Sequence, residues 1–114
     1  MMARLNYVEL PVGDVAGSKA FFETAFGWSL TAFGPGYAAT EGRGCDIGLN
    51  GDPDDGTSAP LAVIETDDLE AALGSVEAAG GTVTRPIFAF PGGRRFHFRE
   101  PSGNELAIYV NEPG

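Results

Sequence analysis

One histidine is the side chain best suited to acid–base chemistry in this sequence. His97 lies in the stretch 94–99, where polar and aromatic residues alternate. Imidazole has an ordinary pKa near neutral pH, so His97 beside Glu9 or Glu65 could donate or accept a proton, which makes His97 and Glu9 the candidate catalytic residues. The alternative is a strand histidine that hydrogen-bonds locally or faces solvent, because no motif surrounds His97.

Further candidates for ligand contact are aromatic or charged. Tyr7 and Tyr109 could supply hydroxyl groups or stack on a planar ligand, although strands also use tyrosine for ordinary packing. Arg95 could hold an anionic group or point into water. The remaining candidates are Glu65, Asp46 and Trp28, of which Trp28 could cover a pocket or pack in the core.

Composition excludes several classes of site. A single cysteine, Cys45, leaves no internal disulfide and no cysteine-based zinc motif, and its alternation with Ile47 and Leu49 predicts an inert core thiol. The sequence has no P-loop, no G-x-G-x-x-G after a strand and no G-x-S-x-G elbow. The formal net charge of −9 argues against nucleic-acid binding, which needs basic side chains. An acidic surface favours solubility and could attract a cationic ligand.

Hydropathy gives no sign of a membrane partner or a leader segment. No apolar run approaches the roughly 20 residues of a membrane-spanning helix. An alternating segment follows directly after Met1-Met2-Ala3-Arg4, so we expect no signal peptide and a cytoplasmic location. A length of 114 residues fits one domain, 1–114.

The positioning elements follow from periodicity and from turn-forming residues. The first half predicts a strand over 5–12, a helix capped by Asp14 and ending near Ala25, and strands over 28–33, 37–41 and 45–50. The breaker-rich stretch 52–59 predicts a linker. The second half predicts a strand over 61–66, a helix over 69–79, and strands over 82–90, 94–99 and 105–110, the first of these three interrupted at Pro86. We expect the two halves to form two modules, residues 4–51 and residues 60–112.

The second half repeats the first at a shift of 54 positions (68 − 14 = 54). The shift pairs the helix-capping Asp14 with Asp68, Val15 with Leu69 and the helix-terminating Gly27 with Gly81. Chance similarity between two strand–helix units is the alternative. A true repeat predicts an α+β protein of two βαβββ modules, with helices on one face of mixed sheets and a cavity on the other.

Alternation along each strand predicts which side chains lie opposite the helices. Phe96 and Phe98 should pack under a helix, which leaves Arg95, His97 and Arg99 on the other face. The same reasoning assigns to that face Tyr7 and Glu9, then Gly48 with Asp46 and Asn50, then Leu61, Val63 and Glu65, and finally Glu105, Ala107 and Tyr109.

Several segments resemble a known family over nearly the whole chain. The first part of the chain resembles the opening of the glyoxalase/bleomycin resistance/dioxygenase (vicinal oxygen chelate, VOC) superfamily. The residues that carry the resemblance are Val8-Glu9-Leu10-Pro11-Val12-Gly13-Asp14, followed by Phe21-Phe22-Glu23 and Phe26-Gly27-Trp28. A segment of the second half resembles the D-P-x-G-N turn of this superfamily; it reads Glu100-Pro101-Ser102-Gly103-Asn104-Glu105-Leu106. The short proteins related to lactoylglutathione lyase are the most similar in pattern. The resemblance implies two tandem βαβββ modules that form curved mixed sheets around a cleft.

The resemblance also implies where a metal would be held. Members usually bind a divalent metal through His and Glu side chains at four inward-facing strand positions. In this sequence the corresponding positions are Tyr7, Gly48, Leu61 and Ala107, which offer neither carboxylate nor imidazole. We therefore expect no metal and no other cofactor.

Three functions remain after these exclusions. The first is metal-independent binding or sequestering of a small molecule, cationic or aromatic, as in relatives of the bleomycin-resistance type. The second is a lyase or isomerase reaction on a small oxygenated metabolite, with His97 or a glutamate moving the proton. A scaffold domain without a ligand is a third, weaker possibility. The resemblance further implies a homodimer.

Overall fold

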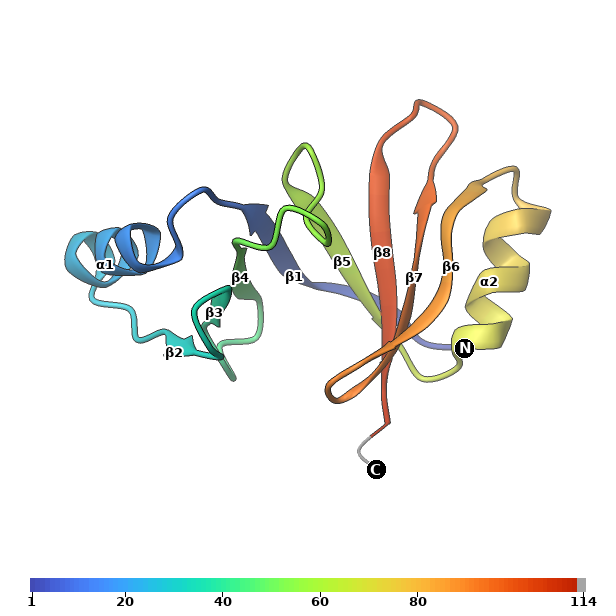
Figure 1. Cartoon of the computed structure of the whole chain (residues 1–114). Coiled ribbons are helices and arrows are strands. Elements are labelled where there is room, and N and C mark those ends of the chain that lie inside the picture. The colour runs from blue at the N-terminus through green and yellow to red at the C-terminus, as the bar shows by residue number, and fades with distance from the viewer. Residues whose placement is uncertain (113–114) are drawn as a thin grey trace. The chain divides into compact units, whose positions relative to one another are not determined.

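The computed structural model describes residues 1–112, which form two helices and eight strands (Figure 1). The chain divides into two compact units. One unit, the N-unit, comprises residues 7–61; the other, the C-unit, comprises residues 1–6 and the described part of 62–114. Strand β1 (Ala3–Pro11) contributes residues to both.

The N-unit holds one helix and the sheet order β2-β3-β4-β1. Its elements after β1 are α1 (Val15–Phe26), β2 (Thr31–Ala32), β3 (Tyr37–Ala39) and β4 (Asp46–Asn50). Strands β1 and β4 are parallel, with Tyr7 opposite Asp46 and Glu9 opposite Gly48, whereas β2–β3 and β3–β4 are antiparallel. The helix-side core is formed by Leu30, Ala38 and Leu49, with Leu10, Val12, Val15, Phe22 and Trp28 packed against it.

The C-unit repeats this plan in the order β5-β8-β7-β6. Its elements are β5 (Leu61–Thr66, of which Leu61 belongs to the N-unit), α2 (Leu69–Ala78), β6 (Thr82–Phe90), β7 (Gly93–Arg99) and β8 (Glu105–Asn111). Strands β5 and β8 are parallel, and β6–β7 and β7–β8 are antiparallel. Its core is formed by Leu69 and Ala72 of α2 with Phe96, Phe98, Ile108 and Val110 of the sheet.

The predicted α+β class and the two βαβββ modules with mixed sheets are confirmed. Both predicted caps are present: the carboxylates of Asp14 and Asp68 accept hydrogen bonds from the backbone N–H of Gly17 and Ala71, each at 3.0 Å. The second helix ends at Ala78, two residues earlier than the shift of 54 predicts from the end of α1 at Phe26. The glycine that takes the left-handed conformation after it is Gly80, with φ +96°, whereas Gly27 takes this conformation after α1.

Three sequence expectations were wrong in detail. The strand expected over 28–33 is reduced to Thr31–Ala32, since Trp28 and Leu30 pack into the helix-side cluster instead of extending the sheet. Pro86 does not interrupt β6, because shifts of register absorb it between Val83 and Phe88. Cys45 precedes β4 and is exposed, so it is no core thiol.

Neither α1 nor α2 has the length and apolar character needed to cross a membrane, as far as the described chain extends.

Candidate functional site

His97 lies on β7 between two core aromatic residues, with its side chain on the face opposite α2. Its neighbours Phe96 and Phe98 belong to the helix-side core, as the alternation predicts. The imidazole is only 2% exposed. Its Nδ1 lies 3.0 Å from Oε2 of Glu105, and its buried Nε2 has no hydrogen-bond partner among the described residues. A buried polar atom without a partner is uncommon and points to a functional role.

Burial disfavours the charged form of this imidazole. The pKa of His97 is lowered from its ordinary 6.5 mainly by burial; the hydrogen bond to Glu105 opposes this effect, and the positive charges of Arg95 and Arg85 reinforce it. A neutral imidazole that hydrogen-bonds a carboxylate through Nδ1 carries its proton there. We therefore assign a lone pair, and not a proton, to the unpartnered Nε2, which can accept a hydrogen bond or a proton.

Glu105 is the carboxylate that orients His97, whereas the sequence suggested Glu9 or Glu65. Its Oε2 also accepts a hydrogen bond from Oγ1 of Thr84 at 3.3 Å. Alternation had placed Glu105 on the correct face, but it could not show that the antiparallel pairing of His97 with Ala107 brings the glutamate two residues away within reach.

Arginine and aromatic side chains surround the imidazole on the same face. The Phe88 ring centroid lies 5.8 Å from that of His97. The guanidinium carbon of Arg95 lies 5.2 Å from the centroid of Phe88 and 5.9 Å from that of Phe90. Tyr109 packs edge-on against Phe90 at 6.2 Å. The structure thus brings together the predicted Arg95 and Tyr109 with Phe88 and Phe90, which the sequence analysis missed because it expected an interruption at Pro86.

Glu65, another predicted ligand contact, is used within the C-unit. Its carboxylate accepts hydrogen bonds from the side chains of Arg4 at 3.4 Å, Asn6 at 3.2 Å and Asn111 at 2.7 Å. The Tyr109 hydroxyl donates to Oδ1 of the same Asn6 at 3.3 Å. These bonds fasten the start of β1 to β5 and β8.

A second polar cluster lies in the N-unit around Glu9, which is 4% exposed. The Tyr37 hydroxyl donates to Oε2 of Glu9 at 3.2 Å, and the Asn50 amide donates to Oε1 at 3.0 Å. The same amide donates to Asp55 at 3.1 Å, and the hydroxyls of Tyr7 and Tyr37 are hydrogen-bonded to each other. Tyr37 was missed because β3 is too short for alternation to assign its face.

The Tyr37 hydroxyl is held in its neutral, donating form. Burial raises the pKa of Tyr37 above its ordinary 10.0, and the charge of Glu9 adds to the effect. Because the Tyr37 hydroxyl donates its hydrogen bond to Glu9, Tyr7 is the donor in the hydrogen bond between the two tyrosines. The cluster therefore satisfies the buried carboxylate of Glu9 with fixed donors.

The positions implied for a metal do not fit one. In the N-unit, the hydroxyls of Tyr7 and Tyr37 lie over Gly48, so closely that a Cβ atom at Gly48 would overlap both. Leu61 and Ala107 are buried apolar residues, 1% and 0% exposed. Within residues 1–112, no three side chains of His, Cys, Asp or Glu are grouped so that they could hold a metal ion.

Two predicted contact residues have other surroundings. Asp46 accepts hydrogen bonds from Oγ1 of Thr40 at 2.8 Å and from the backbone N–H of Arg43 at 3.3 Å, so it closes the turn before β4. Trp28 stacks on Phe22 at 5.5 Å within the helix-side core. The structure does not bring either residue into the Glu9 cluster.

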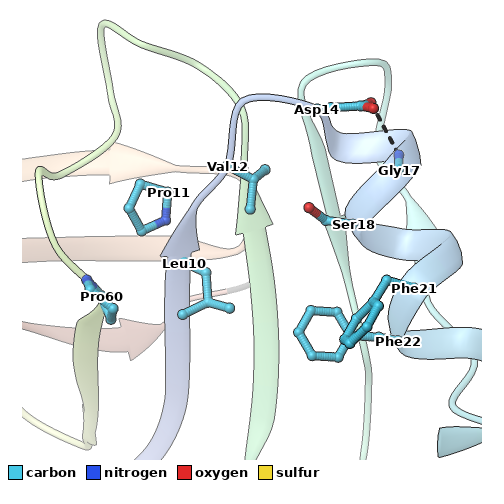
Figure 2. A pocket seen from close by; sticks show the side chains of 9 residues that line it. All are labelled: Leu10, Pro11, Val12, Asp14, Gly17, Ser18, Phe21, Phe22 and Pro60. Atoms are coloured by element: carbon cyan, nitrogen blue, oxygen red, sulfur yellow. Dashed lines mark hydrogen bonds between the residues drawn. The ribbon is translucent and has the colours of Figure 1, made fainter. Parts of the chain in front are cut away.

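The N-unit also has an apolar groove between β1 and α1, with a volume of about 520 Å³ (Figure 2). Leu10 and Val12 lie on one side and Phe21 and Phe22 on the other. The only titratable side chain in its lining, Asp14, caps the helix through Gly17. The groove therefore offers apolar surface and no group that could perform acid–base chemistry.

Comparison with known proteins gives a family and a fold. Residues 4–108 match the family model described as Glyoxalase/Bleomycin resistance protein/Dioxygenase superfamily. No curated protein matches the chain significantly.

Several solved structures are similar to this chain with TM-scores above 0.7, among them the following three. A glyoxalase/bleomycin resistance protein/dioxygenase superfamily member from Vibrio splendidus 12B01 has a TM-score of 0.73 and 17% identity, over 97% of this chain and all (100%) of that one. Methylmalonyl-CoA epimerase from Mycobacterium tuberculosis has 0.73 and 15%, over 96% and 89%. The Mn(II)-bound glyoxalase from Novosphingobium aromaticivorans has 0.71 and 23%, over 98% of this chain and 41% of that chain. At such identities the likeness shows the fold alone.

Proposed function

Because this chain belongs to the glyoxalase/bleomycin resistance/dioxygenase superfamily, we propose that it binds a small molecule and does so without a divalent metal. The observation that carries the proposal is the buried Nε2 of His97, which has no protein partner among the described residues. A ligand that donates a hydrogen bond to this atom would satisfy it. The binding surface is the face of the C-unit sheet opposite α2, with His97, Arg95 and Tyr109.

The side chains of this face suit an aromatic ligand. Phe88, Phe90 and Tyr109 offer ring surfaces for stacking beside the imidazole. The net charge of −9 attracts cations at long range. Charges separated by more than about 8 Å are screened at physiological salt, however, and the face itself carries arginine. The aromatic part of the sequence-based ligand prediction is therefore better supported than the cationic part.

Metal independence is supported by the donor set. The hydroxyls of Tyr7 and Tyr37 fill the space over Gly48, and Leu61 and Ala107 supply no donor atom. The test is elemental analysis of the protein after incubation with zinc, nickel, manganese or iron salts and removal of free metal. We expect less than about one tenth of an equivalent of metal to remain bound per chain. One equivalent of bound metal would overturn this part of the proposal.

The binding proposal is tested with a chemically broad panel of aromatic small molecules, which includes cationic antibiotics. We expect at least one class to bind by isothermal titration calorimetry, and His97→Gln to weaken that binding. The matched control is Arg43→Gln, a polar substitution in the N-unit, where Arg43 lies 5.4 Å from the ring centroid of Trp28. No binding across the panel, or equal weakening by both substitutions, would contradict the proposal.

An enzymatic function is the second candidate, favoured by the His97–Glu105 pair. A neutral imidazole, oriented by a carboxylate at Nδ1, can remove a proton through Nε2. A lyase or isomerase acting on a small oxygenated metabolite would use this base to abstract a proton beside a carbonyl group. The other predicted catalytic residue, Glu9, would then have a structural role, since Tyr37 and Asn50 already bind both of its oxygens.

Hydrogen exchange distinguishes the enzyme from the binding protein. Small 2-hydroxy ketones and 2-oxo aldehydes would be incubated with the metal-free protein in D₂O and followed by proton NMR. Deuterium incorporation that is lost in His97→Gln and retained in Arg43→Gln supports the enzyme. Tight binding without exchange supports sequestration.

A homodimer and a cytoplasmic location remain predictions from the sequence. We propose the dimer because the superfamily resemblance implies it, and sedimentation equilibrium over a range of protein concentrations would test it. A monomeric mass at every concentration would contradict the dimer. Fractionation of cells that express the full-length protein would test the location.

A further inference from the structure

The apolar groove between β1 and α1 has the size of a small-molecule site and lies entirely within the N-unit. Its volume of about 520 Å³ falls within the range of known ligand sites, roughly 300–1,000 Å³. Leu10 and Val12 of β1 face Phe21 and Phe22 of α1 across it (Figure 2). Phe21 is 60% exposed and packs edge-on against Phe22 at 5.3 Å. Contiguous apolar surface of this kind, open to solvent, marks a place where another molecule binds.

The internal repeat explains why α1 leaves this groove open. Corresponding rows of side chains cross the helix-side face of the two sheets. They are Leu10, Leu49 and Ala38 in the N-unit and Ile64, Ile108 and Phe96 in the C-unit. The small Ala38 lets α1 pack over β3 and β4, so the apolar side chains of β1 remain uncovered. In agreement, none of the twelve described residues of α1 is buried, whereas α2 buries Leu69 and Ala72.

The N-unit that contains the groove is strongly acidic. Its residues 7–61 include eight acidic and two basic side chains, a formal net charge of −6 (2 − 8). Both basic side chains are engaged outside the groove lining. Lys19 forms an ion pair with Glu23 at 3.2 Å, and the guanidinium of Arg43 lies over the ring of Trp28. The negative charge near the groove therefore has little positive charge to oppose it.

This negative charge is concentrated where α1 begins, at one end of the groove. Asp14 accepts the capping hydrogen bond of Gly17 through Oδ1, and its Oδ2 has no hydrogen-bond partner among residues 1–112. The acidic stretch 52–55 starts beside it, since Gly51 lies so close to Val15 that a Cβ atom there would be 2.5 Å from Cγ2 of the valine. The partial charge at a helix N-terminus, about half a unit, offsets only part of the charge on Asp14.

We propose that this groove binds a small cationic amphiphile, with its apolar body between β1 and α1 and its positive group at Asp14. Charge complementarity favours this occupant over a second copy of the chain, whose own net charge of −9 would be repelled by the same surface. The groove is a second binding site, independent of the one proposed at His97.

The test uses three probes that share a phenylhexyl body and differ in the end group. At neutral pH, 6-phenylhexylamine is a cation, 6-phenylhexan-1-ol is neutral and 6-phenylhexanoate is an anion. Trp28 is the only tryptophan of the sequence, and it stacks on Phe22, a wall of the groove, at 5.5 Å. Its fluorescence therefore reports occupancy of the groove. Each probe is titrated into the full chain at low and at physiological salt.

We expect the amine to change the Trp28 emission saturably and to bind about threefold or more tightly than the alcohol, because an exposed ion pair adds modestly to affinity. The carboxylate should bind most weakly, and added salt should reduce these differences. Asp14→Asn keeps a good helix cap but removes the charge, so it should reduce the preference for the amine over the alcohol. Glu41→Gln is the control, since Glu41 is exposed and lies outside the groove lining.

The apolar wall is tested with two exposed phenylalanines of the N-unit. Phe21→Ala should weaken binding of the amine and the alcohol about fivefold or more, because it removes apolar surface from the groove. Phe33→Ala is the matched control, since Phe33 is also exposed but does not line the groove, and it should leave both affinities unchanged.

Four results would overturn the proposal. The first is no saturable change in Trp28 emission with any probe, and the second is binding of the alcohol or the carboxylate as tight as that of the amine. The third is equal weakening by Phe21→Ala and Phe33→Ala. The fourth is a dimer that Phe21→Ala dissociates in sedimentation equilibrium, which would assign the groove to a second copy of the chain.

One further comparison separates the groove from the site proposed on the C-unit. If His97→Gln weakens binding of the amine more than Phe21→Ala does, the amine binds at the C-unit face. That result would overturn the groove as its site and would support the proposed function. Loss of binding in Phe21→Ala alone supports the groove, whatever the aromatic panel shows for His97.

Discussion

His97 and Glu105 form a hydrogen-bonded pair on the face of the C-unit sheet opposite α2, with Nδ1 of the imidazole 3.0 Å from Oε2 of the carboxylate. The pair fixes which nitrogen carries the proton. It leaves the other nitrogen, Nε2, buried and without a hydrogen bond within residues 1–112. The chemistry proposed for this chain depends on that arrangement.

The stability of the protein should depend on pH through His97. Because burial lowers the pKa of His97 below 6.5, the unfolded chain binds more protons than the folded one between the folded pKa and 6.5. The free energy of unfolding should therefore fall as the pH decreases below about 6.5 and should be insensitive to His97 above it. Urea titrations between about pH 7 and pH 5 should show a steeper decline for the wild type than for His97→Gln. Parallel declines would contradict this assignment.

Removal of the Glu105 carboxylate should destabilise the fold. Glu105→Ala leaves the Nδ1–H of His97 buried without its acceptor, which should cost about 1–3 kcal/mol of unfolding free energy. Glu105→Gln keeps an acceptor oxygen and should cost less, while the pKa of His97 should fall further because the negative charge is lost. Urea denaturation measures the first effect and histidine NMR the second. Glu41→Ala, at an exposed position, is the control and should change little.

Gly48 should tolerate no side chain while the two tyrosine hydroxyls lie over it. Gly48→Ala should cost about 1–3 kcal/mol of unfolding free energy through overpacking, since the new Cβ would overlap the hydroxyls of Tyr7 and Tyr37. Gly13→Ala meets no atom within 4 Å and should be nearly neutral. The cost at Gly48 should shrink in a Tyr7→Phe, Tyr37→Phe background. A full, undiminished cost in that background would show that the hydroxyls are not the obstacle.

Tyr37 should stay protonated in alkaline solution. Burial, reinforced by the charge of Glu9, raises the pKa of Tyr37 above 10.0. Of the three tyrosines, Tyr37 should contribute nothing to the phenolate absorbance that develops up to about pH 11 while the protein remains folded. The wild type and Tyr37→Phe should then show the same increase in absorbance at about 295 nm, where phenolate absorbs. A smaller amplitude in Tyr37→Phe would mean that this hydroxyl ionises normally.

Much of the fold could be predicted because its signals are local. Asp14 and Asp68 cap their helices as their spacing predicts, and Phe96 and Phe98 pack on the helix side as alternation predicts. The end of α2 at Ala78 and the loss of most of the strand over 28–33 depend on packing within each unit, which periodicity does not report.

The candidate site was less predictable because its contacts join different strands. Alternation placed His97 and Glu105 on one face but could not supply the β7–β8 register that joins them. Phe88 lies opposite Arg95 on this face, but the sequence predicted a break of the strand at Pro86 and so assigned no face to Phe88. Tyr37 completes the Glu9 cluster from a strand of three residues, too short to show a period.

The most direct test of the account is nitrogen-15 NMR of the single histidine at pH 7. We expect a neutral imidazole with its proton on Nδ1 and an unprotonated Nε2 whose resonance shifts when an aromatic ligand binds. A charged imidazole, or a neutral one with its proton on Nε2, would contradict it, because neither form offers the lone pair on which the proposed ligand contact depends.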